Sequence, residues 1–176
     1  MISSRALSAL FAVFLACLYP APAHAGEIFG GLYVHDIESP LTKSGVEGGI
    51  DLQLGWRGEP LTSLRIQLHA FVSVNSAGNT HYATVGISRK FGDRIYVRPG
   101  VGVAVHTGSA GKHQIVGNND IEFGSRLLFE PELAVGTRLN ERMTIEASWV
   151  HLSHAQLFVK QNPGIDNVGL RLNYRF

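Results

Sequence analysis

Three residues near the C-terminus have the side-chain types needed for ester hydrolysis. His151 and Ser153 are separated by one residue, and Asp166 follows after an intervening loop-like segment. An imidazole can take the proton of a serine hydroxyl while a carboxylate orients the imidazole, and the serine oxygen then attacks an acyl carbonyl. Side chains two residues apart on a strand share a face, so His151 can reach Ser153. His-x-Ser pairs are common, however, and an ordinary polar rim at a membrane interface is the alternative interpretation.

The elements that must position these residues are strands, because apolar and polar residues alternate with a period of two. The alternation is clearest in 46–57, and its apolar face carries the following side chains: Val46, Ile50, Leu52, Leu54 and Trp56. The same pattern recurs further along the chain, in 64–74, 95–105, 121–139 and 168–176, and more weakly in 27–36, 79–90 and 142–154. These stretches predict eight antiparallel strands separated by short turn-like segments. Pro99 and Pro131 lack an N–H for the ladder, which predicts a bulge or a strand end at each.

Alternation alone does not decide which face of a barrel is outside, but the polar face does. It carries acids, arginines and glutamines interspersed with glycines, which suits the narrow interior of an eight-stranded barrel. We therefore expect an all-β, eight-stranded antiparallel transmembrane β-barrel whose apolar face contacts lipid, with an aromatic girdle that includes Trp56, Trp149, Tyr174 and Phe176. The residues expected to face lipid include Leu52, Leu68, Phe123 and Leu172. Those expected to face the interior include Asp51, Arg65 and Arg171.

Residues 1–25 have the features of an export signal. Arg5 precedes an apolar run, and Ala23-His24-Ala25 has the form of a signal-peptidase site, so residues 26–176 form the expected barrel domain. Phe14 makes the segment before Cys17 a poor lipobox, and the mature chain has no cysteine. Removal of Arg5 leaves fourteen Lys and Arg against fourteen acids. This balance excludes nucleic-acid binding by a basic surface.

The strand count also predicts where the candidate residues lie. If the chain enters from the periplasm, the connections near 37–44, 75–79, 107–119 and 155–164 face the outside of the cell and are the longer ones, as expected for such barrels. On strand 142–154, His151 and Ser153 continue the outward-facing row, and Asp166 ends the outward row of the last strand. The three residues therefore converge on one lipid-facing patch near the outer leaflet, where a polar cluster costs free energy.

The C-terminal segment resembles the outer-membrane lipid A 3-O-deacylase family, of the PagL type. The resemblance covers about the last 26 residues: His151-Leu152-Ser153, then Asn162-Pro163-Gly164-Ile165-Asp166 and a closing strand. It implies an esterase that removes the 3-hydroxyacyl chain at position 3 of lipid A in the outer membrane, without a metal or cofactor.

The resemblance also implies roles for individual residues. His151 corresponds to the base, Ser153 to the nucleophile and Asn162 to the oxyanion-hole residue. The family's acid is usually Glu and falls on Asp166 when one loop insertion is allowed. The position after the nucleophile is often Asn in the family and is His154 here.

Two other functions stay open at this point. A non-enzymatic small barrel would have no reason to align three polar residues on a lipid-facing patch. A lipid A palmitoyltransferase-type barrel would need an interior acyl pocket, whereas this cluster faces outward. The remaining histidines lack metal-ligand spacing, so no metal site is expected. Lipid A or lipopolysaccharide and the membrane are the expected partners, and a homodimer is left open.

Overall fold

The computed structural model describes residues 26–39, 42, 46–61, 63–113, 115, 117, 120–155, 157 and 163–176. Within these ranges the regular elements are strands, and no helix in them is long and apolar enough to cross a membrane. The strands, in chain order, are β1 (Glu27–Val34), β2 (Ile50–Arg57), β3 (Ile66–Asn75), β4 (Tyr82–Arg89), β5 (Phe91–Gly92), β6 (Ile95–His106), β7 (Leu127–Arg138), β8 (Met143–Leu152) and β9 (Ile165–Arg175). The predicted signal segment 1–25 lies outside the described residues, so its cleavage stays a prediction.

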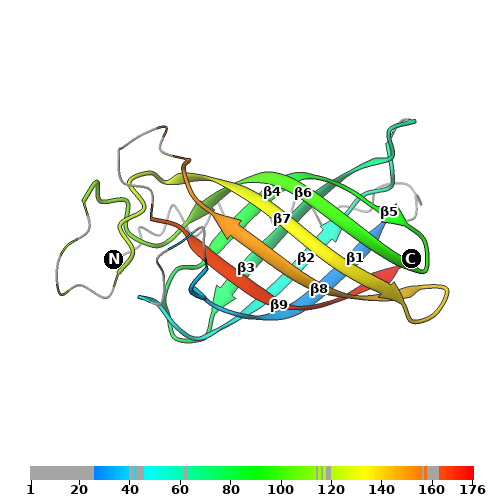
Figure 1. Ribbon diagram of the computed structural model, residues 1–176, viewed down its shortest axis with the longest axis horizontal. Helices are drawn as coiled ribbons and strands as arrows, with labels where there is room; N and C mark the ends of the chain where they lie inside the picture. Colours follow the sequence, from blue (N-terminus) through cyan, green and yellow to red (C-terminus); the bar gives the residue numbers. More distant parts are fainter. Residues whose placement is uncertain are drawn as a thin grey trace.

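The strands close into a barrel (Figure 1). Neighbouring strands pair antiparallel, with β4 and β5 both paired to β6, and β1 pairs with β9 to complete the ring. β4 and β5 are two segments of one strand interrupted at Lys90, because both pair with β6 in one register, Ser88 with Gly100 and Phe91 with Val97. The predicted eight-stranded antiparallel barrel is therefore confirmed.

Both prolines lie inside strands, where the predicted bulge or strand end does not occur. Instead, the strand pairing is interrupted on one side of each proline. The pairing of β4 with β6 stops one position before Pro99, and the pairing of β7 with β8 stops beside Pro131 and resumes at Phe129 and Ser153. The missing proline N–H explains both interruptions.

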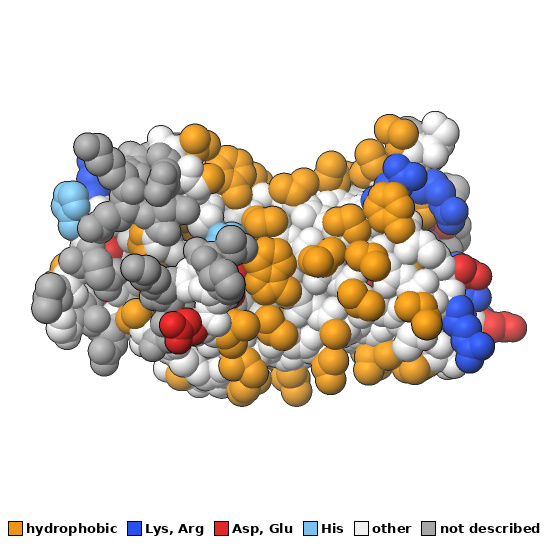
Figure 2. All heavy atoms as spheres, in the orientation of Figure 1, with side chains coloured by type: hydrophobic (Ala, Val, Ile, Leu, Met, Phe, Trp, Pro, Cys, Tyr) orange, Lys and Arg blue, Asp and Glu red, His pale blue; other side chains and the backbone are white. Residues whose placement is uncertain are grey.

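The two faces of the wall have opposite character. Apolar side chains on the outer face are exposed, and Figure 2 shows them spread over the middle of the visible face, with charged side chains toward the two ends and most of the visible Lys and Arg at one of them. Leu52, Leu68 and Leu172 face outward as predicted, whereas Asp51 and Arg171 are fully buried inside.

Three buried arginines organise the interior. Arg171 contacts Glu132 at 3.0 Å and Glu146 at 3.8 Å, and its guanidinium lies 4.5 Å from the centroid of the Phe29 ring. Two further arginines extend the network: Arg57 contacts Glu27 and Glu132, and Arg98 contacts Glu27 and Glu146. We call this set the interior network. It fills the lumen with mutually compensating charges, as the polar face of the sequence predicted.

Three details of the predicted strands are wrong. Phe123 is fully buried rather than lipid-facing, because β7 begins only at Leu127 and the preceding residues fold back, with the Phe123 ring 4.5 Å from that of His106. Arg65 lies in a turn with a φ of 55° and is exposed, not interior. The stretch from residue 46 joins no strand before Ile50, since Gly49 has a φ of 107°, outside the range of an extended strand.

The connections divide the barrel into two ends. We call the end with connections 35–49, 76–81, 107–126 and 153–164 the loop end, and the end with 58–65, 93–94 and 139–142 the turn end. The C-terminus lies at the turn end (Figure 1). The three longest connections share the loop end, as the predicted asymmetry requires, although 76–81 at that end is shorter than 58–65 at the turn end.

Candidate active site

The hairpin of β8 and β9 brings the three predicted residues together at the loop end. His151 lies directly opposite Asp166 in the antiparallel register, so both side chains project from the same face of the sheet. Ser153 follows one alternation later and is held by a bridge to Phe129, whose side chain belongs to the outward row of β7. The three therefore lie on the outer wall, where the parity of the sequence placed them.

The imidazole of His151 joins the other two side chains. Its Nδ1 lies 2.9 Å from Asp166 Oδ1, and its Nε2 lies 2.9 Å from Ser153 Oγ. When Nδ1 carries the ring proton, it donates to the carboxylate, and Nε2 is then a free base facing the serine hydroxyl. The arrangement has the order of contacts that nucleophilic ester hydrolysis requires.

Although it projects from the outer wall, the cluster is shielded. His151 is 8% exposed, Ser153 is 6% exposed and Asp166 is completely buried. Part of this enclosure comes from Gly164, which lies so close that an added Cβ would stand 2.6 Å from the Leu152 carbonyl oxygen and 3.1 Å from the His151 ring. Glycine at this position lets the chain before β9 pass directly against the imidazole.

Residues that the sequence did not single out also contact the acid. The Trp149 indole donates to Asp166 Oδ1 at 2.8 Å, and the hydroxyls of Thr42 and Ser39 donate to Oδ2, that of Thr42 at 2.7 Å. Trp149 precedes His151 by two residues in the same outward row, so the sequence predicts its position, but it predicts a girdle residue there and not a donor to Asp166. Ser39 and Thr42 lie in the 35–49 connection and carry no local signal of this contact.

The sequence singled out two further positions beside the nucleophile and in the following loop. Asn162, the expected oxyanion-hole residue, lies outside the described residues. His154 is completely buried, and its position after Ser153 gives it the opposite parity on the strand, so it does not join the cluster on the outer wall.

His35 makes contacts that its sequence context did not predict. At the loop end its two ring nitrogens lie 3.0 Å from carboxylate oxygens of Glu47 and Asp51. Burial by itself lowers the pKa of His35, but the hydrogen bonds and negative charges of Asp51 and Glu47 outweigh it and raise that pKa to about 9. Among the described residues, no group of three or more His, Cys, Asp or Glu side chains could hold a metal ion.

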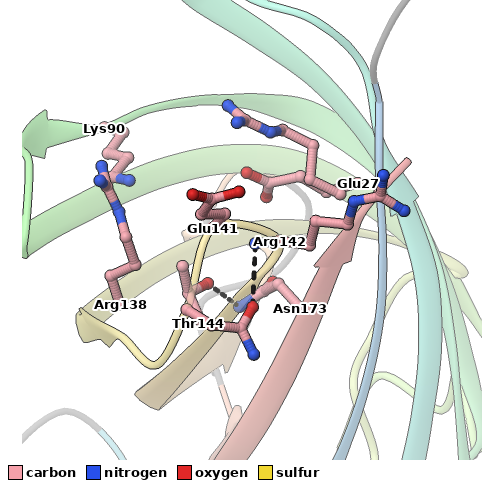
Figure 3. A pocket seen from close by; sticks show the side chains of 9 residues that line it. Glu27, Lys90, Arg138, Glu141, Arg142, Thr144 and Asn173 are labelled. Atoms are coloured by element: carbon pink, nitrogen blue, oxygen red, sulfur yellow. Dashed lines mark hydrogen bonds between the residues drawn. The ribbon is translucent and has the colours of Figure 1, made fainter.

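A cavity lies at the turn end of the barrel, opposite these residues. It measures about 260 Å³, and Figure 3 shows Glu27, Lys90, Arg138 and Glu141 around it. These residues belong to the turn end, where β8 begins and β9 ends, whereas His151 and Asp166 lie at the other ends of those strands. The cavity is therefore separate from the candidate active site.

Comparison with known proteins identifies relatives of the sequence and of the fold. Residues 44–175 match the family model described as lipid A 3-O-deacylase (PagL). No curated protein sequence matches the chain. The solved structure of the outer membrane enzyme PagL aligns with a TM-score of 0.61 and 18% identity, covering 84% of this chain and 98% of that one.

Other solved barrels share the fold without this family's description. A de novo designed transmembrane β-barrel aligns with a TM-score of 0.54 and 9% identity, covering 90% of this chain and all of the other. Neisserial surface protein A aligns with a TM-score of 0.53 and 11% identity, covering 88% of this chain and all of that one. At these identities, the likenesses concern the fold alone.

Proposed function

The chain belongs to the lipid A 3-O-deacylase (PagL) family, and from this we propose that it is an outer-membrane serine esterase that removes the acyl chain ester-linked at position 3 of lipid A. The observation that carries the proposal is the imidazole of His151, placed 2.9 Å from both the Ser153 hydroxyl and the Asp166 carboxylate. No cofactor takes part in the proposed reaction.

The proposed reaction has two stages. Ser153 Oγ attacks the ester carbonyl while His151 Nε2 takes the hydroxyl proton, and the same nitrogen then gives this proton to the departing sugar oxygen, which leaves as a hydroxyl. Water next attacks the acyl-enzyme with His151 again acting as base, which frees a 3-hydroxy fatty acid and restores Ser153. Asp166 stabilises the imidazolium formed in each stage.

An oxyanion donor is also required, because negative charge collects on the carbonyl oxygen in both stages. We assign this role to Asn162, on the basis of the family motif in 162–166. The side-chain amide of an asparagine is an N–H donor suited to such an oxygen.

The location of the cluster suits a substrate that is itself a membrane lipid. His151 and Ser153 lie on the outer wall at the loop end, near the level where the apolar belt ends and polar connections begin. If the loop end faces the outside of the cell, the ester bonds of outer-leaflet lipid A lie at this height. A lipid can then reach Ser153 from the membrane without entering the barrel.

The two alternative functions have less support. A palmitoyltransferase-type mechanism needs an acyl pocket within the barrel, but the lumen here is occupied by Arg57, Arg98 and Arg171 with their acidic partners. A non-enzymatic barrel needs no bridging histidine on its outer wall. We also keep the proposal that the protein forms a homodimer in the membrane. Cross-linking within the membrane tests it.

Mass spectrometry of lipid A from cells with and without the protein tests the proposed function. We expect lipid A to lose the mass of one 3-hydroxyacyl group, with release of the free 3-hydroxy fatty acid, and the purified enzyme to retain its activity in a chelator. Gain of a palmitoyl mass would favour the transferase instead. Unchanged lipid A in membranes that contain the folded barrel, and with the purified protein, would contradict the deacylase assignment.

A further inference from the structure

The Asp166 carboxylate is bound by far more than the histidine. Oδ1 accepts a hydrogen bond from Trp149 Nε1 at 2.8 Å and lies 2.9 Å from His151 Nδ1. Oδ2 accepts hydrogen bonds from Thr42 Oγ1, at 2.7 Å, and from Ser39 Oγ. A carboxylate has about four lone-pair sites, so these four partners occupy its accepting capacity.

These contacts matter because the carboxylate cannot orient itself. The torsion about the last bond of an aspartate side chain is broad, so its own rotamer preference does not fix the carboxylate plane. Donors on both oxygens fix that plane: the two hydroxyls hold Oδ2, and the indole holds Oδ1 beside the histidine. In this orientation the carboxylate accepts a hydrogen bond from the Nδ1–H of His151, which leaves Nε2 basic toward Ser153.

The donors come from two distant parts of the chain, and both are anchored at the site. Trp149 lies on β8, and its ring stacks on that of His151 with centroids 5.9 Å apart and an interplanar angle of 23°. The 35–49 connection is tied to the first residues of β9, because Ile37 N donates to the Asp166 carbonyl oxygen and Asp36 N donates to Asn167 Oδ1. The connection thus meets Asp166 through backbone and side chains.

We propose that Ser39, Thr42 and Trp149 are positioning residues of the active site, which hold the Asp166 carboxylate in the plane that keeps its Oδ1 on His151. The inference rests on the proposed function for its reaction. It makes the first long connection part of the site, although Ser39 and Thr42 lie 127 and 124 residues before the acid in the sequence.

Each donor can be removed with little change of shape. Trp149→Phe keeps an aromatic ring on His151 and loses the N–H, and Thr42→Val keeps the branched side chain and loses the hydroxyl. Ser39→Ala combined with Thr42→Val strips both donors from Oδ2. Thr42→Ser restores a hydroxyl and serves as the conservative rescue.

Matched controls lie at the turn end. Trp56→Phe changes the other tryptophan of the chain, and Thr137→Val removes a hydroxyl that donates to the Arg94 carbonyl oxygen. Heat-modifiable migration in SDS gels shows whether each variant still forms the barrel.

Three measurements report on the carboxylate. The kcat and KM for release of 3-hydroxy fatty acid from lipid A give activity, and the rate of Ser153 labelling by a fluorophosphonate gives nucleophile activation without lipid A. The low-field proton resonance of the His151 Nδ1–H, assigned by its absence in His151→Ala, reports the hydrogen bond to Asp166 directly, whether or not the protein is active on lipid A.

Trp149→Phe should lower kcat by about 10-fold and leave KM nearly unchanged, because it removes a hydrogen bond to a charged group, which is stronger than one between neutral groups. The Ser39→Ala/Thr42→Val double variant should lower kcat by about 100-fold, and each variant should broaden or shift the low-field resonance. Thr42→Ser, Trp56→Phe and Thr137→Val should stay close to the wild type in all three measurements.

A wild-type kcat and an unchanged resonance in the folded double variant and in Trp149→Phe would overturn the inference. Failure of the proposed function looks different: the wild type would then release no fatty acid from lipid A, while the resonance would still respond to the loss of the donors.

Discussion

The interior network and the His151 cluster are both buried and polar, yet they are organised differently. In the interior network each arginine contacts two acids, at distances that range from 2.9 to 3.8 Å, so the charges share partners. In the cluster, His151 has one partner on each ring nitrogen, both at 2.9 Å, and the contacts run in one direction from acid to serine. Shared contacts suit the stability of the barrel, whereas a directed chain of contacts suits proton transfer.

The largest expected effect comes from removing a member of the contacts that run from Asp166 through His151 to Ser153. Ser153→Ala and His151→Ala should each lower turnover by roughly 10⁴-fold or more, because the two residues act as one unit. The double variant should be hardly worse than either single variant, and all three should fold with nearly wild-type resistance to urea. Fatty-acid release by purified protein measures the effect, and full activity in Ser153→Ala would return the cluster to an interfacial rim.

Disrupting the interior network should lower the stability of the barrel and leave turnover nearly unchanged. Arg171→Met leaves Glu132 and Glu146 short of a buried positive charge, which should lower the free energy of unfolding by about 3–5 kcal/mol while kcat of the folded fraction stays near the wild type. Urea unfolding followed by tryptophan fluorescence measures this. Arg138→Met is the matched control, since its exposed pair with Asp93 should contribute no more than about 1 kcal/mol. An equal loss in both variants would mean that the interior network adds no stability.

The oxyanion donor should have an intermediate effect. Asn162→Ala should reduce turnover by roughly 10²–10³-fold without changing urea resistance, because an amide that stabilises the developing charge acts only in the transition state. Comparing kcat and KM for lipid A tests this assignment. A rise in KM with kcat unchanged would assign Asn162 to substrate binding instead.

A pH dependence should appear at the loop end, where His35 is held between Glu47 and Asp51. The pKa of His35 is about 9 in the folded protein and about 6.5 when unfolded, so its protonation stabilises the fold fully below pH 6.5. This contribution, up to about 3 kcal/mol, should fade as the pH rises through 9. Urea unfolding between pH 6 and 10 should show the decline in the wild type and a shallower slope in His35→Gln. Parallel slopes would contradict the role of His35.

The smallest effect is expected where the acid is changed for its longer homologue. Asp166→Glu should keep activity within about 10-fold of the wild type, because Glu is the acid usual in the family and presents the same carboxylate to His151. Kinetic comparison with Asp166→Asn sharpens the test, since the amide should lower turnover much further. Loss of activity equal to that of Asp166→Asn would show that the site accepts only the shorter acid.

The sequence alone determined the barrel fold and, for most strands, which face points outward. Alternation with a period of two placed Leu52 and Leu172 outside and Asp51 and Arg171 inside, because successive residues of a strand must point to opposite faces. The same rule placed His151 and Ser153 in one outward row and brought Asp166 to it across a hairpin. These conclusions held because they depend on local geometry and on pairing between neighbouring strands.

The tertiary structure alone decided the positions and contacts of residues that lie outside the paired strands. Phe123 left its expected face because the residues before β7 are not in a strand, and parity has no meaning there. The contacts of Ser39 and Thr42 with Asp166 depend on the closure of β1 against β9, which brings the first connection beside the last strand. Barrel closure joins residues that are far apart in sequence, so no local pattern could have predicted how the acid is held.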